Sequence, residues 1–162
     1  MKPNFRVGFG FDVHQLKDGI PFWLGGIQIP HEKGILGHSD ADVLIHALCD
    51  AILGACGDRD IGHHFPNTDA ALKGIDSKEL LKRVIKLLGE KKFAVGNADI
   101  TVCAERPKIN PHLIKMKETL APLMNVSVED IAIKATTNET MGFIGREEGI
   151  VAYATVLIYR ID

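Results

Sequence analysis

The segment from Phe5 to His14 alternates strictly between apolar side chains and small or polar ones. A period of two is typical of a β-strand that is covered on one face only. One face carries the aromatic and aliphatic residues, and the other carries Gly8, Gly10, Asp12 and His14. Side chains two apart in a strand point the same way, so Asp12 and His14 are expected about 7 Å apart along the chain. The segment therefore predicts a half-buried strand that presents a carboxylate and an imidazole to one site.

The remaining sequence alternates between strand-like and helix-like segments. Gly25-Gly26 separates two short apolar runs and supplies the positive φ angles of a tight hairpin. A helix capped by Ser39 is expected from residue 40 to 54 or 57, followed by a loop at 57–69. A second helix opens with a capping box at 76–79 and ends at Gly89, and a third begins at Asn110-Pro111. Further strands are expected at 95–104, 131–136 and 149–161. The last strand is apolar on both faces, which predicts a central strand that is covered twice. We predict an α+β fold with helices packed on one face of a mixed β-sheet, in a single domain of residues 1–162.

Composition excludes several classes of protein. A formal net charge of -2 over 162 residues gives no basic surface for nucleic acid, and no apolar run is long enough to cross a membrane. Cys49, Cys56 and Cys103 form no CxxC pair, and an odd number of scattered cysteines is typical of reduced thiols. We interpret them as core residues and expect a cytoplasmic protein, because no apolar or arginine-rich leader precedes the patterned sequence.

Histidine and aspartate recur together and indicate a metal site. Asp42, His46 and Asp50 are four residues apart on the helix expected after residue 40, with no lysine or arginine among them to neutralise the acids. This helix can bring His46 toward Asp12 and His14, giving three ligands and one open position, which is the pattern of a catalytic zinc site. Alone, the Asp-x-His motif equally fits a strand end where an aspartate orients a surface histidine. The polar residues of the helix favour the metal interpretation.

Three other segments have ligand-binding character that is weak when each is taken alone. His38 and Ser39 precede a helix start, where free N–H groups favour an anion, and Ser39 can also act as a simple cap. Residues 135–139 end a strand in hydroxyls and a carboxylate, which suit phosphate oxygens and a hard divalent ion. Residues 104–108 end another strand, and loops at such positions often hold ligands.

Six segments together resemble the 2-C-methyl-D-erythritol 2,4-cyclodiphosphate synthase family. They are GFGFDVH, GHSDADVLIHALCDAILG, GDRDIGHHFPNTD, AERPKI, KATTNE and GFIGREEGI, and they occur in the family's order over nearly the whole chain. The resemblance implies cyclisation of 4-diphosphocytidyl-2-C-methyl-D-erythritol 2-phosphate with release of CMP, a step of non-mevalonate isoprenoid biosynthesis. It also implies a zinc ion on Asp12, His14 and His46, and a second cation, Mg²⁺ or Mn²⁺, on Glu139 with the substrate phosphates.

The resemblance assigns further residues to the substrate. His38, Ser39 and the loop of Asp60, Ile61 and Gly62 would hold the erythritol phosphate, and the remaining binding residues implied are Phe65, Asp69, Ala104, Pro107, Lys108, Ile109, Ala135, Thr136, Thr137, Asn138, Glu139, Phe143 and Arg146. Thr137 and His38 also count among the catalytic residues implied. Asn67 stands where the family usually has aspartate, which removes a charge at that position.

The resemblance also implies a homotrimer with active sites shared between subunits. Phe11 and Phe143 would line an apolar cavity on the three-fold axis, and Arg146 and Glu148 would lie at its mouth, where an isoprenoid diphosphate can bind. Two other functions use the same ligands: a zinc-dependent nucleotide or phosphoester hydrolase, and a non-catalytic binding protein with structural zinc. The second would require a fourth protein ligand, and none is evident near Asp12 and His14.

Overall fold

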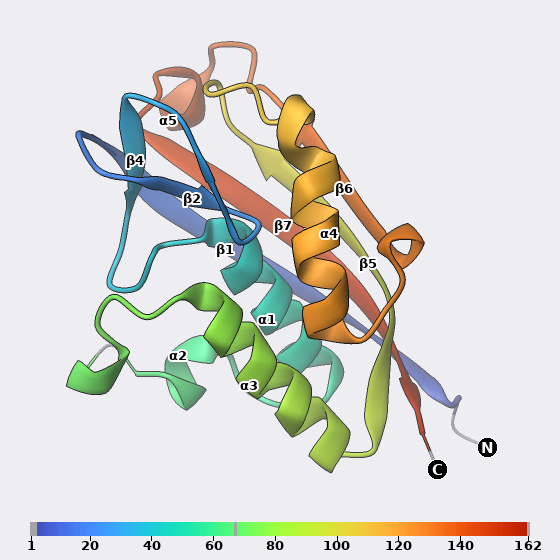
Figure 1. Ribbon diagram of the computed structural model, residues 1–162. Coiled ribbons are helices and arrows are strands. Elements are labelled where there is room, and N and C mark those ends of the chain that lie inside the picture. Colours follow the sequence, from blue (N-terminus) through green and yellow to red (C-terminus); the bar gives the residue numbers. More distant parts are fainter. Residues whose placement is uncertain (1–2, 67, 162) are drawn as a thin grey trace.

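The computed structural model describes residues 3–66 and 68–161, so Asn67 lies outside the described residues. The strands are β1 (Phe5–Asp18), β2 (Phe22–Leu24), β3 (Ile27–Ile29), β4 (Lys33–Leu36), β5 (Phe93–Cys103), β6 (Ile131–Thr136) and β7 (Gly149–Arg160). The helices are α1 (Val43–Ala55), α2 (Ile61–His64), α3 (Ser77–Glu90), α4 (Leu113–Met124) and α5 (Gly142–Gly145), with short 3-10 turns η1 (Ala70–Leu72), η2 (Asn110–His112) and η3 (Val128–Asp130) (Figure 1).

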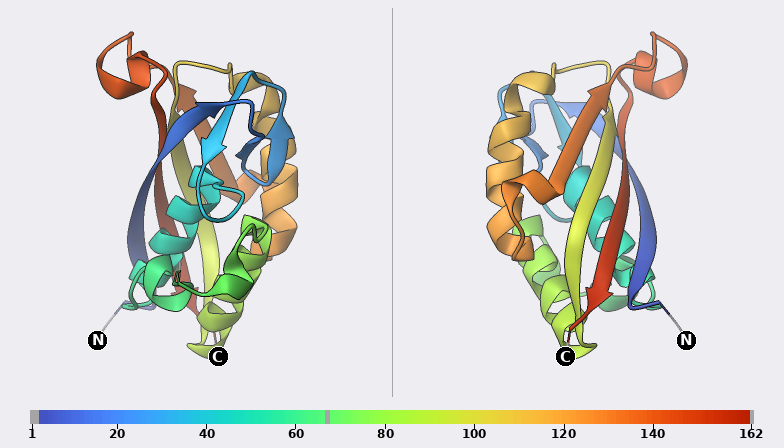
Figure 2. Two further views of the ribbon diagram at one scale, coloured as in Figure 1. Left: turned by 90° about the vertical axis from the view of Figure 1, so that its left-hand side faces the viewer. Right: turned by 90° about the vertical axis from the view of Figure 1, so that its right-hand side faces the viewer.

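A five-stranded sheet in the order β4-β1-β7-β5-β6 forms one layer, and β2 pairs with β3 in a separate hairpin. β5 and β6 are parallel while the other neighbours are antiparallel, so the sheet is mixed. The long helices α1, α3 and α4 lie on one side of the sheet, and α1 packs between the sheet and α3 (Figure 2). The predicted α+β fold with helices on one face of a mixed sheet is confirmed.

The alternation of the first strand is confirmed, and the structure shows which face is covered. Gly8 and Gly10 face α1 so closely that a Cβ on either would lie 1.9 Å from a helix carbonyl oxygen, that of Ala51 or Ala47 respectively. The apolar face, which comprises Phe5, Val7, Phe9, Phe11 and Val13, is 44% to 64% exposed. The glycines thus let the helix backbone approach the strand, and the aromatic face is left open.

The prediction that the last strand is covered on both faces is wrong for a single chain. β7 lies at the centre of the sheet between β1 and β5, but Tyr153, Thr155 and Tyr159 are exposed. Phe11 packs on Tyr153 with ring centroids 5.4 Å apart, so β1 and β7 share one uncovered apolar face. The sequence pattern detected the apolar character of both faces but not which of them a single chain covers.

Replacing Gly10 with alanine should destabilise the fold by about 3 kcal/mol, because the added methyl meets helix backbone that cannot move aside. Gly89→Ala is the matched control, since nothing lies within 4 Å of its Cβ position in α3. That change should be neutral or slightly stabilising, since alanine favours a helix over glycine. Urea unfolding of both variants checks this, and equal midpoints would refute the close packing of β1 on α1.

The first long helix begins later than its sequence predicted. α1 starts at Val43 and its N-cap is Asp42, not Ser39, because the buried Asp42 carboxylate accepts from the backbone N–H of Ile45 at 3.0 Å. The same carboxylate accepts from the N–H groups of Gly25 and Gly26, at 3.0 and 2.7 Å. Asp42 therefore fixes the β2–β3 hairpin to the start of α1, a long-range contact that no local pattern indicates.

Other boundaries differ by small amounts. The predicted 57–69 loop contains the short helix α2, capped by Asp60, whose carboxylate accepts from His63 N–H at 2.9 Å. Helix α3 is capped by Asp76 and ends at Glu90, one residue past the predicted Gly89 stop. β5 starts two residues before the predicted strand and ends at Cys103. Cys49 and Cys56 are buried as expected, whereas Cys103 is only half-buried, and all three are free thiols.

None of the helices in residues 3–66 and 68–161 is long and apolar enough to cross a membrane.

Candidate metal centre and substrate pocket

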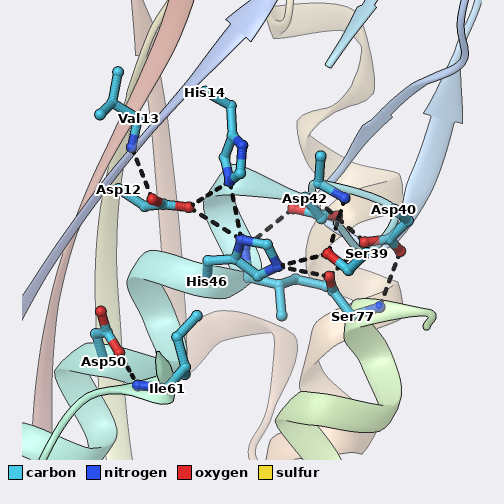
Figure 3. A network of polar contacts seen from close by, with 12 residues as sticks. Asp12, Val13, His14, Ser39, Asp40, Asp42, His46, Asp50, Ile61 and Ser77 are labelled. Atoms are coloured by element: carbon cyan, nitrogen blue, oxygen red, sulfur yellow. Dashed lines mark hydrogen bonds and ion pairs between the residues drawn. The ribbon is translucent and has the colours of Figure 1, made fainter. Parts of the chain in front are cut away.

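Asp12, His14 and His46 meet where β1 crosses the first turns of α1 (Figure 3). Asp12 Oδ2 lies 2.9 Å from His14 Nε2 and 3.0 Å from His46 Nδ1. The two imidazole nitrogens are 3.2 Å apart. One carboxylate oxygen and two imidazole nitrogens thus converge on one point, which is a donor set suited to a divalent metal ion such as zinc.

The charges of these groups reinforce one another. Burial alone would raise the pKa of Asp12, but hydrogen bonds from His14 and His46 outweigh it and lower that pKa to about 2. Burial would lower the pKa of His14, yet the hydrogen bond with Asp12 and its charge raise it. Asp12 is therefore an anion at neutral pH and gives the cluster the negative charge that a cation requires.

The ring nitrogens of His14 and His46 that point away from Asp12 also have hydrogen-bond partners. His14 Nδ1 lies 2.9 Å from the Leu36 carbonyl oxygen, which can only accept, so Nδ1 carries a proton. Nε2 faces the Asp12 carboxylate, and a metal ion bound there would take the place of the Nε2 proton. His46 Nε2 lies 3.2 Å from Ser39 Oγ and 3.0 Å from Ser77 Oγ. Such outer contacts orient metal-binding histidines.

His46 occupies a different environment from the one its sequence indicates. It lies on α1 between the sheet and α3 and is only 7% exposed, whereas the spacing of Asp42, His46 and Asp50 predicted a helix edge beside the core. Asp42 is fully buried as well, and Asp50 is half-buried with its carboxylate accepting from Ile61 N–H at 2.7 Å. The polar residues of α1 are therefore interior groups with assigned partners.

A cavity of about 200 Å³ opens beside the cluster. Its lining residues are Asp12, His14, His38, Ser39, His46, Ile61, Gly62, Phe65, Leu72, Ile75 and Leu80. The cavity thus brings His38, Ser39, Ile61, Gly62 and Phe65 beside the three candidate ligands. Asp60 and Asp69 do not line it, and their carboxylates cap α2 and η1.

The second group of expected site residues lies elsewhere in the chain. Ala104, Pro107, Lys108 and Ile109 follow β5, and residues 135–139 end or follow its parallel neighbour β6. The carboxyl ends of these strands meet at one sheet edge, where Ala104 N–H donates to the Thr136 carbonyl at 3.0 Å and Asn138 N–H donates to Glu105 Oε2 at 3.2 Å. No residue of this group lines the cavity of the metal cluster. In a single chain the two groups of predicted site residues therefore lie apart.

Comparison with known proteins identifies the family. The model of the YgbB family matches residues 5–159. A 2-C-methyl-D-erythritol 2,4-cyclodiphosphate synthase of Bacteroides thetaiotaomicron is 62% identical over 157 residues, covering 97% of this chain and 99% of the relative. One from Parabacteroides distasonis is 63% identical over 158 residues, covering 98% of each chain. The chain belongs to the YgbB family of cyclodiphosphate synthases.

Solved structures agree with this family assignment. The bifunctional IspDF of Campylobacter jejuni superposes with a TM-score of 0.94 at 41% identity, covering 98% of this chain and 43% of that longer one. An IspF of Plasmodium falciparum in complex with CDP superposes with a TM-score of 0.87 at 31% identity, covering 100% of both chains. The recognition of the synthase family from its six sequence segments is confirmed.

The YgbB-family chain also has site features that its sequence did not reveal. Leu72, Ile75 and Leu80 complete the apolar wall of the cavity, and the fully buried Ser77 contacts His46 from the start of α3. None of these residues belongs to a metal-binding motif. Ser77 and Leu80 reach the site because α3 packs on α1, and Leu72 and Ile75 lie in the segment that precedes α3. The apolar periodicity of α3 predicted that this helix is buried, but not what it lies against.

Phe143 and Arg146 belong to a third region. A separate cavity of about 520 Å³ is lined by Val13, His14, Gln15, Phe143, Glu148 and Gly149, beside the uncovered face of the sheet. Arg146 pairs with Glu148 of its own chain through Nε–Oε1 and Nη2–Oε2 contacts of 3.0 and 3.1 Å. This in-chain pair holds the pKa of Glu148 below its usual value.

Proposed function

We propose that this chain cyclises 4-diphosphocytidyl-2-C-methyl-D-erythritol 2-phosphate to 2-C-methyl-D-erythritol 2,4-cyclodiphosphate and releases CMP. Membership of the synthase family supports the reaction, and the observation that carries it is the convergence of Asp12, His14 and His46 beside a cavity lined by His38 and Ser39. The three free cysteines suit the reducing cytoplasm, where we place the activity of this single-domain enzyme.

Asp12, His14 and His46 are proposed to hold zinc. Two nitrogens and one carboxylate oxygen are its usual protein ligands, and among the described residues no fourth ligand joins the group, so one position is open to substrate. Bound there, zinc supplies a Lewis acid for a phosphate oxygen. An open position also argues against a purely structural zinc site.

The substrate residues are proposed to act mainly by position and charge. His38 and Ser39, with Ile61, Gly62 and Phe65, hold the erythritol phosphate in the cavity, and Asp60 and Asp69 order the loop beside it by capping α2 and η1. At the other half-site, residues 104–109 and 135–138 are proposed to hold the cytidine and its phosphates. Thr137 Oγ1 donates to Glu139 Oε1 at 3.2 Å and orients that carboxylate for a second cation, Mg²⁺ or Mn²⁺, shared with the phosphates.

The reaction itself needs no protein nucleophile. An oxygen of the 2-phosphate attacks the β-phosphorus, the bond from that phosphorus to the bridging oxygen breaks, and CMP leaves with the electron pair. The attacking group is already an anion, so the protein must bring two negative groups into line and exclude water. The apolar wall of Phe65, Leu72 and Leu80 beside the cluster serves that exclusion.

Product analysis in heavy-oxygen water tests the proposal. Cyclisation uses a substrate oxygen, so the product should contain no solvent label and should appear in equal amounts with CMP. A zinc-dependent hydrolase would incorporate one labelled oxygen, and such labelling would contradict the proposal. The family comparisons support the synthase and do not support the hydrolase.

We further propose that the enzyme is a homotrimer in which the metal half-site of one chain faces the nucleotide half-site of its neighbour. The uncovered face of β1 and β7, with Phe11 on Tyr153, supplies the apolar surface for association. Sedimentation should give three times the 17.7 kDa chain mass. Phe11→Glu should dissociate it, whereas Ile114→Glu, at an exposed position of α4, should not. An active monomer would refute the proposal.

An isoprenoid diphosphate is proposed to bind where three copies of the Phe143 and Arg146 region meet. The cavity beside Phe143 offers an apolar lining, and arginine is suited to bind diphosphate. Arg146 must then either break its contact with Glu148 or contact Glu148 and the diphosphate at the same time. Arg146→Ala should weaken binding of geranyl diphosphate by about tenfold or more in calorimetry, since a charged hydrogen bond contributes about 1.5–3 kcal/mol. Unchanged affinity would contradict this proposal.

A further inference from the structure

A buried serine and a carboxylate extend the metal cluster behind His46. Ser77 is the first residue of α3, is fully buried, and places Oγ 3.0 Å from His46 Nε2. Its hydroxyl donates to Asp40 Oδ1, and its backbone N–H donates to Asp40 Oδ2 at 2.9 Å. The three side chains form one continuous chain of contacts (Figure 3).

The direction of each hydrogen bond in this chain follows from what each group can do. A carboxylate only accepts, and a serine hydroxyl has a single proton to give. Because Ser77 gives that proton to Asp40, its oxygen can only accept from His46. His46 must then keep a proton on Nε2, so the proton that a bound metal ion would replace is the one on Nδ1, which faces the Asp12 carboxylate. Nδ1 is the nitrogen that lies 3.0 Å from Asp12 and 3.2 Å from His14.

Helix capping does not account for this arrangement. The N-cap of α3 is Asp76, whose side chain accepts from Lys78 N–H at 2.9 Å, so the hydroxyl of Ser77 is not needed to start the helix. Among residues 3–66 and 68–161, Asp40 makes no ion pair with a lysine or arginine, and Asp42 N–H is its other donor, at 3.3 Å. The carboxylate is thus directed at Ser77 and, through it, at His46.

We propose that Asp40 and Ser77 are positioning residues that fix the tautomer and ring orientation of His46 so that Nδ1 is presented to the metal ion. The inference rests on the metal role proposed for His46. His14 is fixed in the corresponding way by a backbone carbonyl, that of Leu36. The two histidines therefore bind through different nitrogens, Nε2 of His14 and Nδ1 of His46, and a separate partner selects each one.

The test measures zinc affinity on the full-length protein without substrate, by competition with a chromophoric chelator. Ser77→Ala and Asp40→Asn should each raise the zinc Kd about 10- to 100-fold. Asp76→Asn is the matched control, because it changes a carboxylate at the same helix start that does not touch His46. It should keep the Kd of the parent. A parent-like Kd in Ser77→Ala would overturn the inference.

Spectroscopy separates positioning from support of the fold. The cobalt-substituted Ser77→Ala and Asp40→Asn proteins should show altered d–d bands, and nitrogen NMR of the zinc-loaded parent should find the His46 proton on Nε2. If Asp40 and Ser77 only supported the fold, the variants would melt lower yet keep the zinc Kd and cobalt spectrum of the parent, and the inference would fail. Should Ser77→Ala not fold, Asp40→Asn at its half-buried site decides by the same two readouts.

These measurements do not depend on the reaction. If the parent makes no cyclic product while both variants lose zinc affinity, the proposed function fails and the positioning role of Asp40 and Ser77 stands. If the parent makes the cyclic product and both variants bind zinc as the parent does, the positioning role fails and the proposed function stands.

Discussion

Replacing His46 with alanine should lower the turnover of the CDP-linked substrate by about 10³-fold or more. The variant removes one of three converging candidate ligand atoms, so the zinc ion proposed there should bind weakly and in altered geometry. Lewis-acid stabilisation of a phosphoryl transition state contributes several kcal/mol, and each 1.36 kcal/mol corresponds to a factor of ten. CMP release and metal content, measured on the same preparation, give the result.

The stability of this variant should also fall. The spacing of the polar residues predicted that His46 lies at a helix edge beside the core, but His46 is 7% exposed and contacts Ser39 and Ser77. Its loss removes one hydrogen bond from each hydroxyl, while Ser77 keeps its bond to Asp40 and Ser39 keeps the bond from Ala41 N–H. Each lost hydrogen bond costs about 0.5–1.5 kcal/mol. The protein should therefore melt lower and still fold.

His31→Ala is the control for this loss of stability. His31 is half-buried, packs edge-on against Phe22 with ring centroids 6.0 Å apart, and does not line the cavity of the cluster. It should lower the melting temperature while zinc content and turnover stay at the level of the parent. If His46→Ala instead keeps its zinc and the activity of the folded fraction, His46 is a structural histidine and the metal assignment is wrong.

The parts of this fold that the sequence predicted well are those decided by local pattern. The alternation of β1, the Gly25-Gly26 turn and the apolar periodicity of α3 each specify one element without reference to the others. The start of α1 was misplaced because the choice between Ser39 and Asp42 as cap depends on the β2–β3 hairpin, to which Asp42 is bonded. Contacts between elements decide such boundaries, and local periodicity does not contain them.

The same limit applies to the site. Asp12 and His14 were paired by strand geometry, and the polar spacing on α1 pointed to His46, so the metal centre was predicted from residues that lie on two neighbouring elements. Ser77 follows His46 by 31 residues and lies in a predicted capping box that gives no sign of a metal site, and only the packing of α3 on α1 brings it to the histidine. The two groups of residues that the family resemblance joins lie apart in one chain, and we propose that a second copy brings them together.

Glu139→Gln should lower turnover by about 100-fold while leaving zinc content and folding unchanged. Glu139 is exposed, and its Oε1 accepts from Thr137 Oγ1 at 3.2 Å, a contact that the isosteric amide oxygen can keep. What the change removes is the negative charge proposed to hold the second cation, and losing electrostatic stabilisation of this kind costs about 2.7–4 kcal/mol. Exposed substitutions of equal shape alter stability by about 0.5 kcal/mol at most.

Initial rates measured against Mg²⁺ concentration test this role directly. The parent should saturate with Mg²⁺, and Glu139→Gln should need a much higher concentration to reach its lower maximum, because a neutral amide is a poor ligand for a hard cation. Glu118→Gln, at an exposed position of α4, removes the same charge from a helix that contains none of the predicted site residues and should behave as the parent. A Glu139→Gln enzyme with the rate and Mg²⁺ dependence of the parent would exclude Glu139 as a cation ligand. That result would not bear on the zinc site proposed at Asp12, His14 and His46, because Glu139 is not among its ligands.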